Sequence, residues 1–328
     1  FLDFCHKEGI VTEQQTGIPL TKIGSTEFTE TFLRMVAFKE GFGEVLATGV
    51  IGAAEELGQR AMDLLPRVVA TRGGEKKDYD PRVLITTGIT YATEPRRAIQ
   101  QLHEIASLTM AWLGMGNTGP GSKPGSAFST ESFRTVAKKL WGSEIAADFS
   151  TYEGKAMAAK RMQDRVFFKE SMVLCDLRWT MTQAGRILGT TGDTVFEEQV
   201  YSAITGHEMD AAGLAQAGER IFNLQRAILL RQGWGGREGD TILDYFFTGP
   251  FQKNELFFNV EGLLPGRDGE VISKVGATVD RQQFDAMMTE YYELRGWGPA
   301  TGYPERQKLE ELDLKDVADD LERRGLLG

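Results

Sequence analysis

Few side chains in this sequence could hold a metal or act as a nucleophile. There are two cysteines, Cys5 and Cys175, and three histidines, His6, His103 and His207. Thiolate and imidazole groups are the usual soft metal ligands, and both also serve in proton or redox chemistry. Two cysteines can neither form a disulfide framework nor complete a four-thiolate metal site. If Cys175 binds a metal, its partner ligands must come from outside this chain.

Cys175 lies in the stretch FFKESMVLCDLRW, residues 167–179, where apolar and aromatic side chains are mixed with charges. Three interpretations are open. The cysteine could pack as a small hydrophobe, act as a redox thiol, or be one ligand of a larger site. The nearby acids Glu170 and Asp176 disfavour a reactive thiol, because anions disfavour the thiolate.

The other candidates carry weaker signals. Cys5 lies at an expected helix end and is predicted to be structural. The histidines are far apart in sequence, and none has the i,i+4 spacing of a helical metal pair. His103 stands out because it follows ATEPRR on an amphipathic helix, yet most histidines in such places pack or face water. The glycine-rich residues 233–240 follow a helix and lack a phosphate-loop pattern, so they predict a helix stop.

The elements that must position these residues are mostly helical. Apolar residues at helical spacing, with capping residues and glycine stops, predict helices within 25–43, 43–58, 93–114, 130–148, 154–176, 194–206, 209–233 and 280–296, with two short ones from Pro304 and Leu314. Strand patterns occur only at 82–91 and 270–279, and neither has a partner run nearby. The Gly-, Pro- and Ser-rich residues 114–129 predict a linker.

Composition excludes several classes of protein. Lys and Arg total 37 against 47 Asp and Glu, a net charge of −10, which argues against a nucleic-acid binder. No apolar run approaches the roughly 18 residues needed to span a bilayer. The first residues resemble no signal peptide and read as the inside of a helix. The residues alone therefore predict a cytoplasmic, acidic, mostly helical protein of two domains.

Several segments, in order, resemble the aldehyde ferredoxin oxidoreductase family of tungsten- or molybdenum-dependent bis-pterin enzymes. The first are FCHKEGIVTEQQTGIPLTKIGS, AFKEGFGEVLATGVIGAAEELG and DYDPRVLITTGITYATEPRR. The later ones are YEGKAMAAKRMQDRVFFKESMVLCDLRW, AGERIFNLQRAILLRQGWGGREGDTILDYFFTGP and FDAMMTEYYELRGWGPATGYPERQKLEELDL. Their order and spacing over nearly the whole chain make the resemblance specific.

The resemblance implies an all-α, multihelical fold of two domains similar to domains 2 and 3 of the family. Residues 1–98 would form an N-terminally incomplete domain 2, and residues 99–328 would form domain 3. The implied cofactors are a tungsten or molybdenum bis-pterin and a [4Fe–4S] cluster. Both would need residues upstream of Phe1, including three more cluster cysteines and a first pterin-binding loop.

The resemblance also assigns roles to residues. The family has a motif Asp-x-x-x-Leu-Cys between pterin and cluster, and its cysteine is the fourth cluster ligand. The matching residues here are Glu170, Leu174 and Cys175, with Glu in place of Asp. They would bind the cofactors, with Cys175 the metal ligand. His103 is the candidate for catalytic proton transfer, although RRAIQQLH departs from the family's arginine-glycine pattern before its histidine.

The implied reaction is oxidation of an aldehyde to a carboxylic acid, with electrons passed to ferredoxin or a partner subunit. ATEPRR and the C-terminal region are also similar to the branch that contains the catalytic subunit of tungsten benzoyl-CoA reductases, which reduce an aromatic ring. A helical scaffold without catalysis is the alternative from another class. Expected partners are ferredoxin or an electron-transfer subunit and a small organic substrate, in a homodimer or larger complex.

Overall fold

The structure is a computed structural model of the 328-residue chain. It describes residues 1–65, 70–71, 74–75, 79–95, 103–114, 123–126, 128–176, 196–256 and 258–328, with only the backbone for 70–71, 74–75 and 103. Helices dominate these residues, so the prediction of an all-α, multihelical protein is confirmed. Within the described ranges, no helix has the length and apolar content needed to cross a bilayer.

The described residues fall into two compact units. The first comprises those of Phe1–Asp78 with Ile242–Tyr245, and the second those of Tyr79–Pro95, Gln100–Thr241 and Phe246–Gly328. The predicted boundary between residues 98 and 99 refers to the domains of the family and stays a prediction. The compact units divide earlier, because residues 79–95 pack with the second unit.

The first unit is a set of short helices around a small apolar core. Its elements are α1 Leu2–Lys7, α2 Glu13–Thr16, a 3₁₀ turn Leu20–Lys22, α3 Thr26–Phe38, α4 Gly43–Leu46, α5 Gly49–Leu57, α6 Gln59–Met62 and the strands β1 Ala70–Thr71 and β2 Gly74–Glu75. Ser25 caps α3 as expected, its hydroxyl accepting from the Phe28 N–H at 3.1 Å. Cys5 lies fully buried in the core of this unit.

The second unit holds the remaining helices and a small hairpin, except that Asp244 and Tyr245, the first two residues of the helix Asp244–Thr248, belong to the first unit. These elements are α8 Thr86–Thr93, α9 His103–Trp112, α10 Thr130–Val136 with a π-helical turn Ala137–Trp141, a 3₁₀ turn Glu144–Ala147, α11 Lys155–Ser171, α13 Phe196–Thr205, α14 Ala211–Arg231, a 3₁₀ turn Gly236–Glu238, α15 Asp244–Thr248, β3 Leu263–Pro265, β4 Val271–Ser273, α16 Arg281–Arg295, α17 Arg306–Glu311 and α18 Lys315–Arg323.

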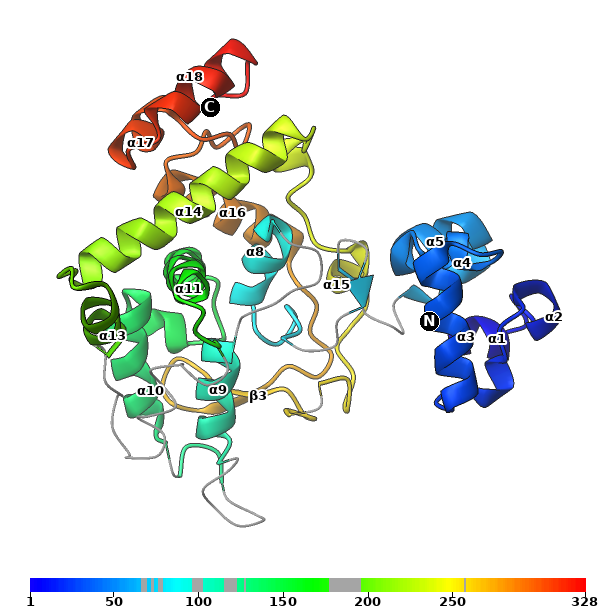
Figure 1. The fold of residues 1–328 in the computed structure, drawn as a ribbon. Coiled ribbons are helices and arrows are strands. Elements are labelled where there is room, and N and C mark those ends of the chain that lie inside the picture. The colour runs from blue at the N-terminus through cyan, green and yellow to red at the C-terminus, as the bar shows by residue number, and fades with distance from the viewer. Residues whose placement is uncertain are drawn as a thin grey trace. The chain divides into compact units, whose positions relative to one another are not determined.

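Helix α11 is the centre of the second unit. It contacts α14, α16, α8 and the π-helical turn, and Figure 1 shows it enclosed by the other helices of the unit. Buried residues occur on every face of α11, including Lys155, Asp164 and Lys169. A helix buried all round is normally apolar. The charges on α11 therefore need partners from the elements around it.

Neighbouring elements supply those partners. The ammonium group of Lys155 donates to the carbonyl oxygens of Ile145 at 3.1 Å, Asp148 at 2.7 Å and Glu153 at 3.3 Å. Its three N–H donors are thus satisfied without a carboxylate. From the other side, Arg295 of α16 forms a buried ion pair with Asp164.

One predicted strand is wrong and the other is confirmed in part. Residues 82–91 contribute most of α8, in which every residue is buried. Its β-branched residues suggested a strand, but the threonine hydroxyls bond back to helix carbonyls, as Thr93 does to Ile89 at 2.8 Å. The strand predicted within 270–279 forms β4, antiparallel to the short β3 that the sequence pattern did not reveal. The predicted linker 114–129 lies largely outside the described residues.

The contact between α11 and α14 depends on Gly218. A Cβ atom built on Gly218 would lie 1.9 Å from the carbonyl oxygen of Asp164. Two non-bonded heavy atoms cannot approach each other so closely. The backbones of the two helices meet at this point because no side chain separates them.

We expect Gly218→Ala to lower the free energy of unfolding by about 1–3 kcal/mol, because overpacking outweighs the better helix propensity of alanine. Urea denaturation measures the effect. Gly213→Ala in the same helix is the control, because its Cβ would meet side chains and no backbone: the flexible Met209 at 2.8 Å and the Asp210 carboxylate at 3.4 Å. Equal stability of the two variants would contradict this account of the contact.

Candidate cofactor site at the end of helix α11

Cys175 lies four residues beyond the end of α11 and is exposed, whereas Cys5 is buried. The interpretation of Cys175 as a close-packed core residue is therefore wrong. The predicted structural position of Cys5 agrees with its burial, which raises the pKa of its thiol. Of the two thiols, Cys175 is the one that a metal or a reagent can reach.

The chain leaves α11 through a tight C-terminal cap. The Leu174 N–H donates to the carbonyl of Lys169 at 2.9 Å, and the Val173 N–H donates to the carbonyl of Glu170 at 2.9 Å. This pair of bonds is a Schellman motif, which requires a left-handed residue at its turn. Val173 takes that position with φ +59°, a conformation that β-branched residues rarely adopt, and its side chain is 91% exposed.

The residue after the cysteine is anchored in the interior. The carboxylate of Asp176 forms a short ion pair with the ammonium group of Lys169, and both side chains are fully buried. Asp176 is therefore engaged by a buried cation instead of lying free beside the thiol. Because Lys169 balances the charge of Asp176, Asp176 disfavours a thiolate at Cys175 less than the sequence alone predicts.

Behind this pair lies a second buried ion pair. Glu104, at the start of α9, accepts from Arg165 of α11 at 2.5 and 2.7 Å and from the indole N–H of Trp141 at 2.6 Å. Burial by itself would raise the pKa of Glu104. The positive charges of Arg165 and Lys169, with these hydrogen bonds, hold that pKa below its ordinary value.

Glu197 of α13 completes a buried charge network with these residues. Burial raises the pKa of Glu197, against the opposing pull of the Lys169 and Arg165 charges. Its Oε1 atom is buried and has no hydrogen-bond partner among the described residues. The network, defined as Glu104, Arg165, Lys169, Asp176 and Glu197, thus contains three carboxylates and two cations. Because the network has one more carboxylate than cations, negative charge is in excess. This favours a proton on Glu197, whose pKa is raised.

The structure places the predicted site residues as follows. Glu170, Leu174 and Cys175 lie together at the end of α11, with Glu170 and Leu174 half-buried. His103 is the first residue of α9, and its side chain lies outside what the structure describes. The next residue after His103, Glu104, pairs with Arg165, six residues before the end of α11. The roles of all four residues stay predictions.

The residues that support the cysteine belong to no motif of the sequence. The sequence pattern marks Asp176 only as an acid beside Cys175, and no motif points to Glu104, Arg165, Lys169 or Glu197. A signal existed: Arg165 and Lys169 stand four apart on a helix whose neighbouring positions are Val166, Phe167 and Phe168. Charges on an apolar helical stretch indicate buried partners.

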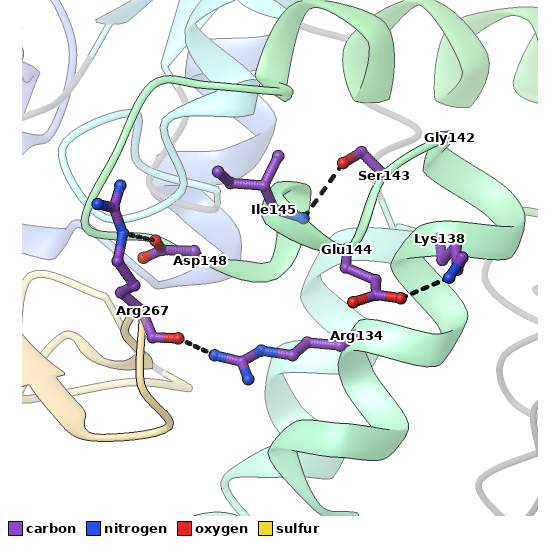
Figure 2. A pocket seen from close by; sticks show the side chains of 8 residues that line it. All are labelled: Arg134, Lys138, Gly142, Ser143, Glu144, Ile145, Asp148 and Arg267. Atoms are coloured by element: carbon purple, nitrogen blue, oxygen red, sulfur yellow. Dashed lines mark hydrogen bonds and ion pairs between the residues drawn. The ribbon is translucent and has the colours of Figure 1, made fainter.

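A surface hollow of about 560 Å³ lies elsewhere in the second unit and contains none of the predicted site residues. Its charges are already engaged: Lys138 with Glu144 at 2.7 Å, Arg267 with Asp148 at 3.4 Å, and Arg134 with the carbonyl of Arg267. Figure 2 shows these side chains pointing toward one another across the hollow. We do not place a cofactor there.

The donor set fits one ligand of a shared cluster and no more. Among the described residues, no group of three His, Cys, Asp or Glu side chains is arranged to hold a metal ion. An exposed thiol at an anchored helix end can supply a single thiolate to iron. A complete cluster site would take its other ligands from outside this chain.

Replacing Glu197 tests the buried charge network. Because the folded protein raises the pKa of Glu197, it binds more protons than the unfolded chain above pH 4.5, and stability falls as pH rises through that window. We expect Glu197→Gln to gain stability over wild type with rising pH, by up to about 1.4 kcal/mol per unit inside the window. Denaturation at pH 4.5 to 8 measures the difference, with the exposed Glu208→Gln as control. A pH-independent difference would contradict the assignment.

Comparisons with known proteins bear on the family and the fold of this chain. Residues 1–314 match the family described as "Aldehyde ferredoxin oxidoreductase, domains 2 & 3". The chain is 22% identical over 314 residues to the tungsten-containing aldehyde ferredoxin oxidoreductase of Pyrococcus furiosus, and 22% over 317 residues to that of Pyrococcus horikoshii. Each match covers 95% of this chain and 41% of the relative, so the chain spans about two fifths of their length.

A solved structure shares the fold. The whole chain superposes on 44% of a chain in the active-site complex BamBC of benzoyl-coenzyme A reductase with 1,5-dienoyl-CoA, with a TM-score of 0.60 and 18% identity. The family match covers nearly all of the sequence, and the helical fold agrees with it. The chain therefore belongs to the aldehyde ferredoxin oxidoreductase family.

Proposed function

We propose that this chain is part of a tungsten or molybdenum bis-pterin oxidoreductase and that Cys175 is one of the four thiolate ligands of its [4Fe–4S] cluster. The observation that carries the proposal is the exposure of Cys175 at the anchored end of a buried helix. Family membership and the tungsten-containing relatives support it.

The proposed reaction is the oxidation of an aldehyde and water to a carboxylate, which releases two electrons and three protons. The bis-pterin metal group supplies the two-electron chemistry. In this chain, Cys175 would give its thiolate to the cluster, through which electrons leave one at a time to ferredoxin or a partner subunit. Glu170 would accept hydrogen bonds from pterin N–H groups, with Leu174 packed beside the cofactors. His103 would move the proton.

Reduction of an aromatic acyl-CoA ring is the second candidate. Its support is the fold shared with the benzoyl-coenzyme A reductase complex and the likeness of ATEPRR to that branch. A scaffold without catalysis would bury its cysteine among close-packed aliphatic side chains, and the exposed thiol of Cys175 argues against it.

The first test is the metal content of the intact protein, purified without oxygen. We expect about four irons and about one tungsten or molybdenum per polypeptide in wild type. Cys175→Ala is expected to lose iron. Cys5→Ala is the control: its thiol is buried in the other unit, and it should keep its iron. Wild type without iron and without tungsten or molybdenum would overturn the proposal in favour of the scaffold.

Activity assays on the protein with its metals bound distinguish aldehyde oxidation from aromatic ring reduction. We expect this protein to reduce a viologen dye when given simple aldehydes, and His103→Asn to lower that rate at least about tenfold, as loss of a proton-transfer group does. Benzoyl-CoA with a reduced dye is the parallel assay. Dye oxidation with benzoyl-CoA and no turnover of any aldehyde would favour the ring reductase.

A further inference from the structure

We propose that Lys169 is the positioning residue for Cys175, holding the chain on both sides of the cysteine and supplying the positive charge that tunes a cluster bound to it. The tuning of a bound cluster rests on the proposed function. The anchoring of the chain around Cys175 concerns this chain alone. Lys169 belongs to neither the predicted motif nor any group assigned above to a cofactor.

The backbone of Lys169 holds the chain before the cysteine. Its carbonyl oxygen accepts from the Leu174 N–H at 2.9 Å and from the Met172 N–H at 3.1 Å. The second bond of the cap, from Val173 to Glu170, forces Val173 into the left-handed region. This cap turns the chain sharply at the helix end and so decides where Leu174 leaves α11.

The side chain of Lys169 holds the chain after the cysteine. Its ammonium group pairs with Asp176, and both side chains have no exposed surface. Leu174 and Asp176 are thus both attached to one residue, and Cys175 is the single residue between them. A span that short leaves the backbone of Cys175 little freedom, while its thiol stays exposed. The arrangement presents a preorganised ligand.

The buried ammonium group of Lys169 would affect the reduction potential of a cluster bound to Cys175. The ammonium group of Lys169 lies in a low-dielectric interior, where its ion pair with Asp176 is shielded from water and charges interact more strongly than at the surface. An iron–sulfur cluster gains negative charge on reduction, and nearby positive charge raises its reduction potential. Lys169 should raise the potential of a cluster on Cys175, and Asp176 should lower it.

These opposite signs separate an electrostatic role from a merely structural one. In the intact, anaerobically purified protein at pH 8, we expect Lys169→Met to lower the cluster's reduction potential and Asp176→Asn to raise it. Lys169→Arg, which keeps the charge, should restore the wild-type potential. Redox titration followed by electron paramagnetic resonance measures all four proteins. Shifts of both neutralising variants in the same direction would overturn the electrostatic part.

Hydrogen–deuterium exchange tests the anchoring part and does not depend on a cluster. In the intact protein stripped of metal, we expect the amides of residues 172–176 to exchange roughly tenfold faster in Lys169→Met than in wild type. Lys160→Met is the matched control. Lys160 lies on the same helix and pairs with Asp164 and Glu219, each at 3.0 Å, so its loss should leave these amides unchanged.

Unchanged exchange at 172–176 in Lys169→Met would overturn the anchoring role. If Lys169→Met does not fold, Asp176→Asn and Lys169→Arg give the same comparison, with faster exchange expected in the first and wild-type exchange in the second. A wild-type protein that binds no cluster would instead refute the proposed function. The exchange result would then still decide whether Lys169 positions Cys175.

Discussion

The burial of α11 is the constraint on which the second unit depends. A helix covered on most sides leaves few of its charges to water, and a buried charge without a partner costs several kcal/mol. Four charges on α11 therefore reach four different neighbours: a loop of carbonyls, an arginine of α16, the start of α9, and the segment after Cys175. These pairs make the packing specific, because a neighbour that shifted would leave a charge uncompensated.

The candidate site follows from that constraint. The helix ends two residues after Lys169, its last fully buried charge, which pairs with Asp176; between these two residues the chain reaches the surface at Val173 and Cys175. Stability and function are coupled here: the pair that neutralises the interior also holds the cysteine, and a change to either residue affects both. Residues outside the predicted motif thus determine how its cysteine is presented.

The sequence predicted the helices well where their apolar positions and caps coincide. Helix α3 with its Ser25 cap and α16 with its Asp280 cap are examples, since local hydrogen bonds define both starts. The helix expected over 43–58 is divided into α4 and α5, and Gly49, at the start of α5, has a φ of +84° that a continuous α-helix excludes. The sequence pattern predicts a strand where α8 lies, because threonines favour β structure; burial and hydrogen bonds from the threonine hydroxyls to helix carbonyls stabilise the helix instead. The exposure of Cys175 and the charge network could not be predicted from the sequence, since both depend on contacts between segments that are far apart in the chain.

Lys155 shows how this protein orders a loop without a metal ion. Its ammonium group binds three carbonyl oxygens of residues 145–153, an arrangement that elsewhere surrounds a bound cation. Burial lowers the pKa of Lys155 to about 7, but its amine is covalently attached to the helix, so a chelator cannot remove it from the loop. A treatment that strips iron and tungsten should therefore leave this loop ordered, and its spectroscopic signals can serve as the internal reference for changes around Cys175.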